Sequence, residues 1–102
     1  MGFEKVFEIQ KSPTEKRLHN VRFESEYPDT PYVIQSTSVK VYDSNGDDVT
    51  EDIVESESHS GDTLQFMVMQ GARRGRYKVI AKAYMSNGED PEAPGELIVD
   101  EF

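Results

Sequence analysis

The stretch from Gly75 to Met85 places apolar side chains at every second position. Such alternation is typical of a strand with one buried face, because successive side chains point to opposite sides. The predicted inward row is Tyr77, Val79, Ala81, Ala83 and Met85. Tyr77 stands near the entrance, where a tyrosine of two-sheet β-sandwiches donates its hydroxyl to backbone a few residues upstream. The stretch therefore predicts a late sandwich strand with Tyr77 as a structural corner.

Alternation recurs along the rest of the chain, whereas helix signals are scarce. We expect further strands at Phe3–Ile9, Leu18–Ser25, Tyr32–Tyr42, Leu64–Met69 and Glu96–Phe102. A polar run at Gln35–Ser38 predicts a break inside the third of these strands. A short acidic piece anchored by Val49, Ile53 and Val54 follows it. Turn residues such as Asn45-Gly46 separate the segments. The pattern predicts an all-β, immunoglobulin-like β-sandwich of about seven antiparallel strands in two sheets.

Length and composition set further limits. With 102 residues and 35% hydrophobic content, the chain suits a single domain spanning residues 1–102. Cysteine is absent, which excludes a disulfide or a thiolate metal site within the chain. The charged start at Glu4-Lys5 and the lack of a stretch of about 20 apolar residues predict neither a signal peptide nor a membrane span. We therefore expect a cytoplasmic protein that has no membrane partner.

Charge is both strongly negative and uneven. The net charge of −9 disfavours nucleic acid as a partner, since binding to phosphates needs clustered cations. Acidic residues fill the segment from Asp43 to Asp62, whereas cations gather just before and within the stretch that starts at Gly75. Two interpretations are open: solvated faces that keep the chain soluble, or charge-complementary assembly. The second makes candidate contact residues of Arg73, Arg74, Arg76, Asp47, Asp48, Glu51 and Asp52.

One acidic segment superficially resembles a calcium-binding loop. Asp43, Asn45 and Asp47 alternate as oxygen ligands would, but Asp48 stands where glycine is required and Val54 where a bidentate glutamate is required. A hairpin turn at Asn45-Gly46 explains the segment better. We predict no metal site, with a weak calcium site formed with other carboxylates as the alternative.

Signals for catalysis are weak. His19 and His59 have no partner at metal-ligand spacing, and no serine lies in a Gly-x-Ser-x-Gly turn. A phosphate-binding loop is also absent, because the segment after Gly71 lacks the required lysine and hydroxyl residue. Four tyrosines could form a sugar-binding platform, namely Tyr27, Tyr32, Tyr42 and Tyr84. We expect no enzyme activity and no cofactor.

Three segments together resemble a known family: Phe7–Arg17, Ser38–Gly46, and Gly75–Val79 continuing through Ser86–Glu89. Their order is similar to that of small immunoglobulin-like virion proteins of tailed bacteriophages and prophages, including fiber-tail adaptor proteins. Shared motifs are Lys-x-Pro-x-Glu, an aspartate-rich middle, and Gly-x-Tyr-x-Val followed by Ser-x-Gly. This chain departs from the pattern at Met67 and Met69 and in the arginines before Gly75.

The resemblance implies a non-enzymatic structural or assembly protein in a tail, adaptor or head-decoration position. It implies other virion proteins or a second copy as partners, and a location in the virion or, during assembly, in the host cytoplasm. On this basis the acidic loop of one copy would meet Arg73–Arg76 of the next in a head-to-tail contact. The alternative is an immunoglobulin-like adhesion or carbohydrate-binding module of a bacterial protein.

Overall fold

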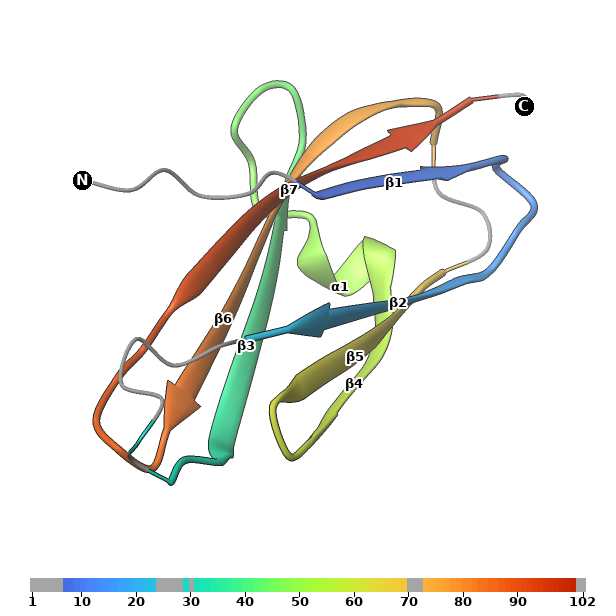
Figure 1. Cartoon of the computed structure of the whole chain (residues 1–102). Coiled ribbons are helices and arrows are strands. Elements are labelled where there is room, and N and C mark those ends of the chain that lie inside the picture. Colours follow the sequence, from blue (N-terminus) through green and yellow to red (C-terminus); the bar gives the residue numbers. More distant parts are fainter. Residues whose placement is uncertain (1–6, 24–28, 30, 70–72, 101–102) are drawn as a thin grey trace.

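Two β-sheets packed face to face form the structure, a computed structural model that describes residues 7–23, 29, 31–69 and 73–100. The four-stranded sheet has the order β1-β7-β6-β3 and the three-stranded sheet the order β2-β5-β4 (Figure 1). The elements are β1 (Phe7–Lys11), β2 (Arg17–Arg22), β3 (Ile34–Tyr42), α1 (Thr50–Ile53), β4 (Val54–Ser60), β5 (Thr63–Val68), β6 (Gly75–Met85) and β7 (Glu92–Val99). The predicted class, an all-β immunoglobulin-like sandwich, is confirmed.

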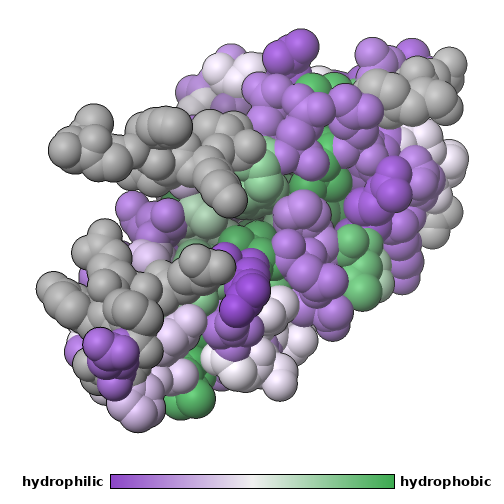
Figure 2. Space-filling view, in the orientation of Figure 1, coloured by the Kyte–Doolittle hydropathy of each residue, from purple (hydrophilic) through white to green (hydrophobic). Residues whose placement is uncertain are grey.

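Alternating side chains from both sheets fill the core. The predicted inward row of β6 is buried throughout, from Tyr77 at 9% exposure to Ala81 at 0%. On the opposite sheet Leu64, Phe66 and Val68 of β5 are buried, as their alternation predicts. Hydrophilic residues dominate the described surface in Figure 2, with scattered hydrophobic ones between them. Removal of these apolar rows from water, at about 25 cal/mol per Å², holds the sheets together without any disulfide.

One strand pair contradicts the prediction that all strands are antiparallel. β1 runs parallel to β7, with Phe7 opposite Gly95 and Lys11 opposite Val99. After β1 the chain crosses to the other sheet to form β2, so β1 has no hairpin partner in its own sheet. The last strand fills that vacant side and enters it in the same direction.

The predicted break inside the third strand is wrong. β3 is continuous from Ile34 to Tyr42, and its irregularity is a register shift between Ile34 and Ser36. An extra residue at a bulge reverses the alternation beyond it. Ile34, Val39 and Val41 therefore all face the core, whereas Val33 is 53% exposed.

The acidic piece after β3 contains a short helix that the sequence did not predict. The Val41 amide donates to the Thr50 hydroxyl at 2.8 Å, and the Thr50 amide and hydroxyl both donate to Asp48 Oδ1. Ile53, at the other end of α1, is buried in the core. The helix thus carries the chain from the edge of β3 to β4 in the other sheet (Figure 1).

The strand ends also differ from the prediction. β1 extends to Lys11 and β2 begins at Arg17, whereas residues 3–6, 24–25 and 101–102 of the predicted strands lie outside the described residues. β7 begins at Glu92 and includes Pro94. Pro94 lies opposite Ile80 of β6, and no described residue of β1 lies opposite it.

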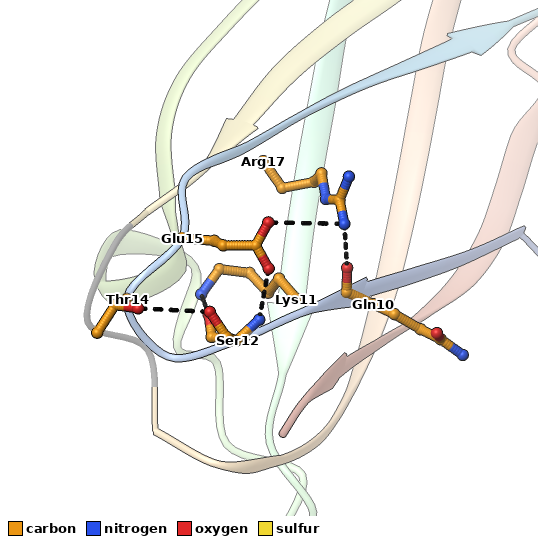
Figure 3. A network of polar contacts seen from close by, with 6 residues as sticks. All are labelled: Gln10, Lys11, Ser12, Thr14, Glu15 and Arg17. Carbon is orange, nitrogen blue, oxygen red and sulfur yellow. Dashed lines mark hydrogen bonds and ion pairs between the residues drawn. The ribbon is translucent and has the colours of Figure 1, made fainter. Parts of the chain in front are cut away.

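The turn from β1 to β2 is held by a polar network around the Lys-x-Pro-x-Glu motif (Figure 3). Lys11 is fully buried, and its ammonium donates to the Ser12 carbonyl at 2.8 Å. Burial lowers the pKa of Lys11, an effect that nearby Glu15 opposes. The Ser12 amide donates to Glu15 Oε1 at 2.8 Å, which lowers the pKa of that carboxyl. Arg17 donates to the Gln10 carbonyl at 3.0 Å and so ties the two strand ends across the turn.

A cluster of rings closes the sandwich between β1 and β2. Phe7 stacks on His19 with ring centroids 4.9 Å apart, and Phe66 meets His19 edge-on at 5.7 Å. The Phe7 ring also lies directly against Gly95, where any Cβ atom would overlap it. Burial among these rings lowers the pKa of His19.

Gly95→Ala should destabilise the fold by about 1–3 kcal/mol, because the new methyl group displaces the Phe7 ring. Chemical denaturation measures the loss. In a Phe7→Ala background the same change should cost less, since the obstructing ring is gone. Equal costs in the two backgrounds would show that Phe7 is not the reason for glycine at this position.

Stability should fall as the pH drops from about 7 to about 5, because the unfolded chain, in which His19 has its ordinary pKa of about 6.5, then binds more protons than the folded chain. The stability that neutral His19 contributes is fully present above its unfolded pKa, and it is lost as the pH falls through its lowered pKa in the folded state. Carboxylates with lowered pKa, including Glu15 and Asp62, act at lower pH. His19→Gln should flatten the dependence measured by denaturation at each pH, and His59→Gln on exposed β4 should not.

Candidate protein contact surface

The arginines before β6 are held in place by the corner tyrosine. The Tyr77 hydroxyl donates to the Arg73 carbonyl at 2.7 Å, which is the upstream backbone bond that the sequence predicted. Between them Gly75 has φ of 149°, a backbone conformation that side-chain-bearing residues rarely adopt. Arg73, Arg74 and Arg76 are exposed around this bend. Buried Tyr77 thus fixes the backbone from which the cations project.

The acidic turn after β3 is a tight reversal built on Asp43. The Asp43 carboxylate accepts bonds from the Asn45 amide at 2.9 Å and from the Asp47 amide at 3.0 Å. Gly46 has φ of 85° and donates its amide to the Asp43 carbonyl at 3.0 Å. Asp43 therefore serves its own turn, as expected for an Asn-Gly reversal. In the part of the chain that the structure describes, no group of three or more acidic, histidine or cysteine side chains is placed to hold a metal ion.

The arginine bend and the acidic turn lie at the same end of the sandwich. Tyr42, at the end of β3, pairs with Lys78 near the start of β6. Burial raises the pKa of Tyr77, while the charges of Arg73 and Asp43 shift it in opposite directions, so both reach the same hydroxyl. A hollow of about 430 Å³ between the two features is lined by Asp43, Ser44, Arg76, Tyr77, Lys78, Pro94, Gly95 and Glu96. We call Arg73, Arg74, Arg76 and this hollow the charged end.

The other predicted acidic residues do not join the arginines. Asp48 lies 3.9 Å from Lys40, and the Thr50 hydroxyl lowers the pKa of the Asp48 carboxyl. Glu51 and Asp52 lie beside Asp48 in a second hollow against β3. Arg76 instead pairs with Glu96 of β7 at 3.3 Å, a partner the sequence analysis missed because it depends on long-range strand pairing. Only Asp47, in the turn itself, accompanies the basic bend.

This placement bears on the head-to-tail hypothesis, which stays a prediction because Asp48, Glu51 and Asp52 lie apart from the arginines. A head-to-tail contact needs its two complementary patches on different sides of the domain. Here the acidic turn and the arginine bend adjoin on one copy. The charged end therefore offers both signs of charge to one partner.

The other candidate groups are dispersed. His19 lies on β2 and His59 on β4, at opposite edges of the three-stranded sheet. Tyr42 and Tyr84 share the outer face of the four-stranded sheet but pair with Lys78 and Ser36, toward opposite ends of β6. The Tyr32 hydroxyl donates to the Phe23 carbonyl at 3.4 Å, and Tyr27 lies outside the described residues. The described tyrosines thus form no continuous platform for a sugar.

Comparison with known proteins adds a structural likeness. The sequence matches no protein-family model and no curated protein. The fold is similar to that of CopC from Methylosinus trichosporium OB3b, with a TM-score of 0.61 and 21% identity over 93% of this chain and 83% of that one. Titin domain M4 matches with a TM-score of 0.47 and 13% identity over 93% of this chain and 86% of its own. The likeness to CopC supports the class that the sheets define, an immunoglobulin-like β-sandwich.

A membrane-spanning helix is not found in the described part of the chain, where α1 has only four residues.

Tyr77→Phe should destabilise the fold by about 1 kcal/mol, because it removes the bond to the Arg73 carbonyl. Denaturant unfolding measures the change. Tyr84→Phe is the matched control, since Tyr84 is 40% exposed on the outer face of the same strand, and it should have little effect. Equal stability of the Tyr77→Phe variant and the unmodified chain would show that the corner bond contributes nothing.

Proposed function

We propose that this chain is a non-enzymatic structural protein of a bacteriophage or prophage particle and that it binds a neighbouring protein through its charged end. The observation that carries the proposal is the bend at which the Tyr77–Arg73 bond supports three exposed arginines beside an acidic turn. The assignment to a particle is supported by the sequence resemblance to small virion proteins. No cofactor, nucleic acid or membrane enters the proposal.

A protein partner suits the chemistry of this end. Arginine binds carboxylates through a planar fork of donors, and it is enriched in protein interfaces. The acidic turn beside it would repel a polyanion but would accept a partner that carries both charges. The side chain of Arg76 is 72% exposed despite its contact with Glu96, so its remaining donors are available to a partner.

Reversal of the arginine charges should prevent incorporation into particles. We expect Arg73→Glu with Arg74→Glu to lower the amount of this chain in purified particles by about tenfold or more, measured by quantitative mass spectrometry. Lys16→Glu with Arg22→Glu makes the same charge change on the three-stranded sheet side and should be incorporated normally.

Two other outcomes would contradict the proposal in different ways. Normal incorporation of the arginine variant would exclude the charged end as the contact. Absence of the unmodified chain from particles produced by cells that express it would exclude a structural role in the particle. In that case binding to a glycan array would favour the adhesion or carbohydrate-binding alternative.

A further inference from the structure

The outer face of the four-stranded sheet has its charges divided by strand. On β6 and β3 the outward positions carry four cations, namely Arg76, Lys78, Lys82 and Lys40, and no carboxylate. On β7 and β1 they carry three carboxylates, namely Glu92, Glu96 and Glu8, and no cation. One half of this face is therefore basic and the other half acidic, with the boundary between β6 and β7.

Strand register places the two halves in matching rows. Lys78 lies opposite Glu96, Lys82 lies opposite Glu92, and between these rows Ile80 lies opposite Pro94. Ile80 and Pro94 are half-buried side chains, so an apolar centre separates two charged rows. This face is formed by described residues only, and β6 is its longest strand.

We propose that this outer face binds the same face of a second copy of the chain, about a two-fold axis that runs along the strands between β6 and β7. Such an axis lays β6 of one copy over β7 of the other. Lys78 then faces Glu96 of the second copy, Lys82 faces its Glu92, and Ile80 packs on its Pro94. This isologous contact uses one surface twice and closes as a dimer.

The charge pattern selects this axis over the other possible one. A two-fold axis across the strands would place β6 over β6, so that cations would face cations and carboxylates would face carboxylates. Like charges in contact disfavour that arrangement. Sheets that stack face to face also keep their strands within about 30° of each other, which the axis along the strands allows.

The ion pairs within one copy leave cations of this face able to bind carboxylates of a second copy. Arg76 pairs with Glu96 at 3.3 Å and Lys82 lies 3.8 Å from Asp90. Lys78 makes no ion pair with the part of the chain that the structure describes, although it is exposed on this face. A carboxylate of a facing copy would supply that partner.

The area of the face predicts a weak dimer. At about 4.8 Å between strands and about 3.3 Å per residue, the residues of β1, β7, β6 and β3 together cover about 500 Å² per copy. Two copies would bury about 1,000 Å², close to the lower limit for specific interfaces. The dimer should therefore depend on protein concentration and should weaken as salt screens its charged rows.

Complementary charge reversals test the proposal. Lys78→Glu alone sets two carboxylates against each other across the interface, and Glu96→Lys alone sets two ammonium groups against each other. Each variant should therefore dimerise about tenfold less than the unmodified chain. An equimolar mixture of the two variants should dimerise again, because in the mixed dimer one copy is acidic at positions 78 and 96 and the other is basic at both, so each facing pair is opposite in sign. The double variant Lys78→Glu with Glu96→Lys should also dimerise, because every facing pair is again opposite in sign. Sedimentation velocity at low salt over a concentration series measures all of these samples.

Matched controls separate this contact from general charge effects. Lys16→Glu and Glu55→Lys reverse an ion pair on the other sheet and should not weaken the dimer, either singly or together. If Glu96→Lys proves unstable because it loses Arg76, Lys82→Glu and Glu92→Lys provide a second complementary pair. Thermal unfolding of each variant establishes that it is folded.

Three results would overturn the proposal: an unmodified chain that stays monomeric up to about 1 mM at low salt, single variants that dimerise normally, or a double variant that fails to recover. The dimer face shares Arg76 and the hollow lined by Lys78, Pro94 and Glu96 with the charged end, but it does not include Arg73 or Arg74. Arg73→Glu with Arg74→Glu should leave the dimer intact while it lowers incorporation into particles. Failure of one proposal is therefore distinguishable from failure of the other.

Discussion

The two-sided pairing of β6 is the constraint on which the rest of the structure depends. β6 is hydrogen-bonded to β3 on one side and β7 on the other, and its inward row from Tyr77 to Met85 packs against the three-stranded sheet. Its outward row, fixed by the same pleat, must then carry side chains that tolerate water. A shift of one residue would exchange the two rows, so burial of one face determines the chemistry of the other.

Local polar bonds hold the ends of the sandwich that the apolar rows do not reach. The Tyr77 hydroxyl fixes the bend before β6, and the network of Lys11, Ser12 and Glu15 fixes the crossing from β1 to β2. Glu57 sits on the core side of edge strand β4 and accepts a bond from the Thr37 hydroxyl at 2.7 Å. An inward-facing charge on an edge strand discourages uncontrolled strand addition, which leaves the sheet faces for specific contacts.

The sequence predicts the features that depend on local alternation of side chains, but few of the features that depend on pairing between distant segments. The buried rows of β5 and β6, the Asn45-Gly46 turn and the corner at Tyr77 follow from period-two spacing and turn chemistry. The parallel β1–β7 pair and the bulge after Ile34 do not, because each is set by a neighbour far along the chain. Helix α1 does not either, because it depends on side-chain bonds of Thr50 to Asp48 and to the Val41 amide. Of the candidate contact residues, the arginines were recognisable as a run, but the partnership of Arg76 with Glu96 requires the register of β7.

Stability and the proposed self-association have one physical origin on the outer face of the four-stranded sheet. Opposite charges on neighbouring strands, such as Lys82 and Glu92, stabilise a sheet by a few tenths of a kcal/mol to about 1 kcal/mol per pair. When all cations lie on one strand of a pair and all carboxylates on the other, a two-fold axis along the strands sets the cations of one copy over the carboxylates of the second copy. The same pattern therefore makes the face complementary in charge to the same face of another copy. An alternating arrangement of signs along each strand would stabilise the monomer equally well and would not distinguish the two axes. The segregation of charge by strand is therefore the feature that the stability of a single copy does not require.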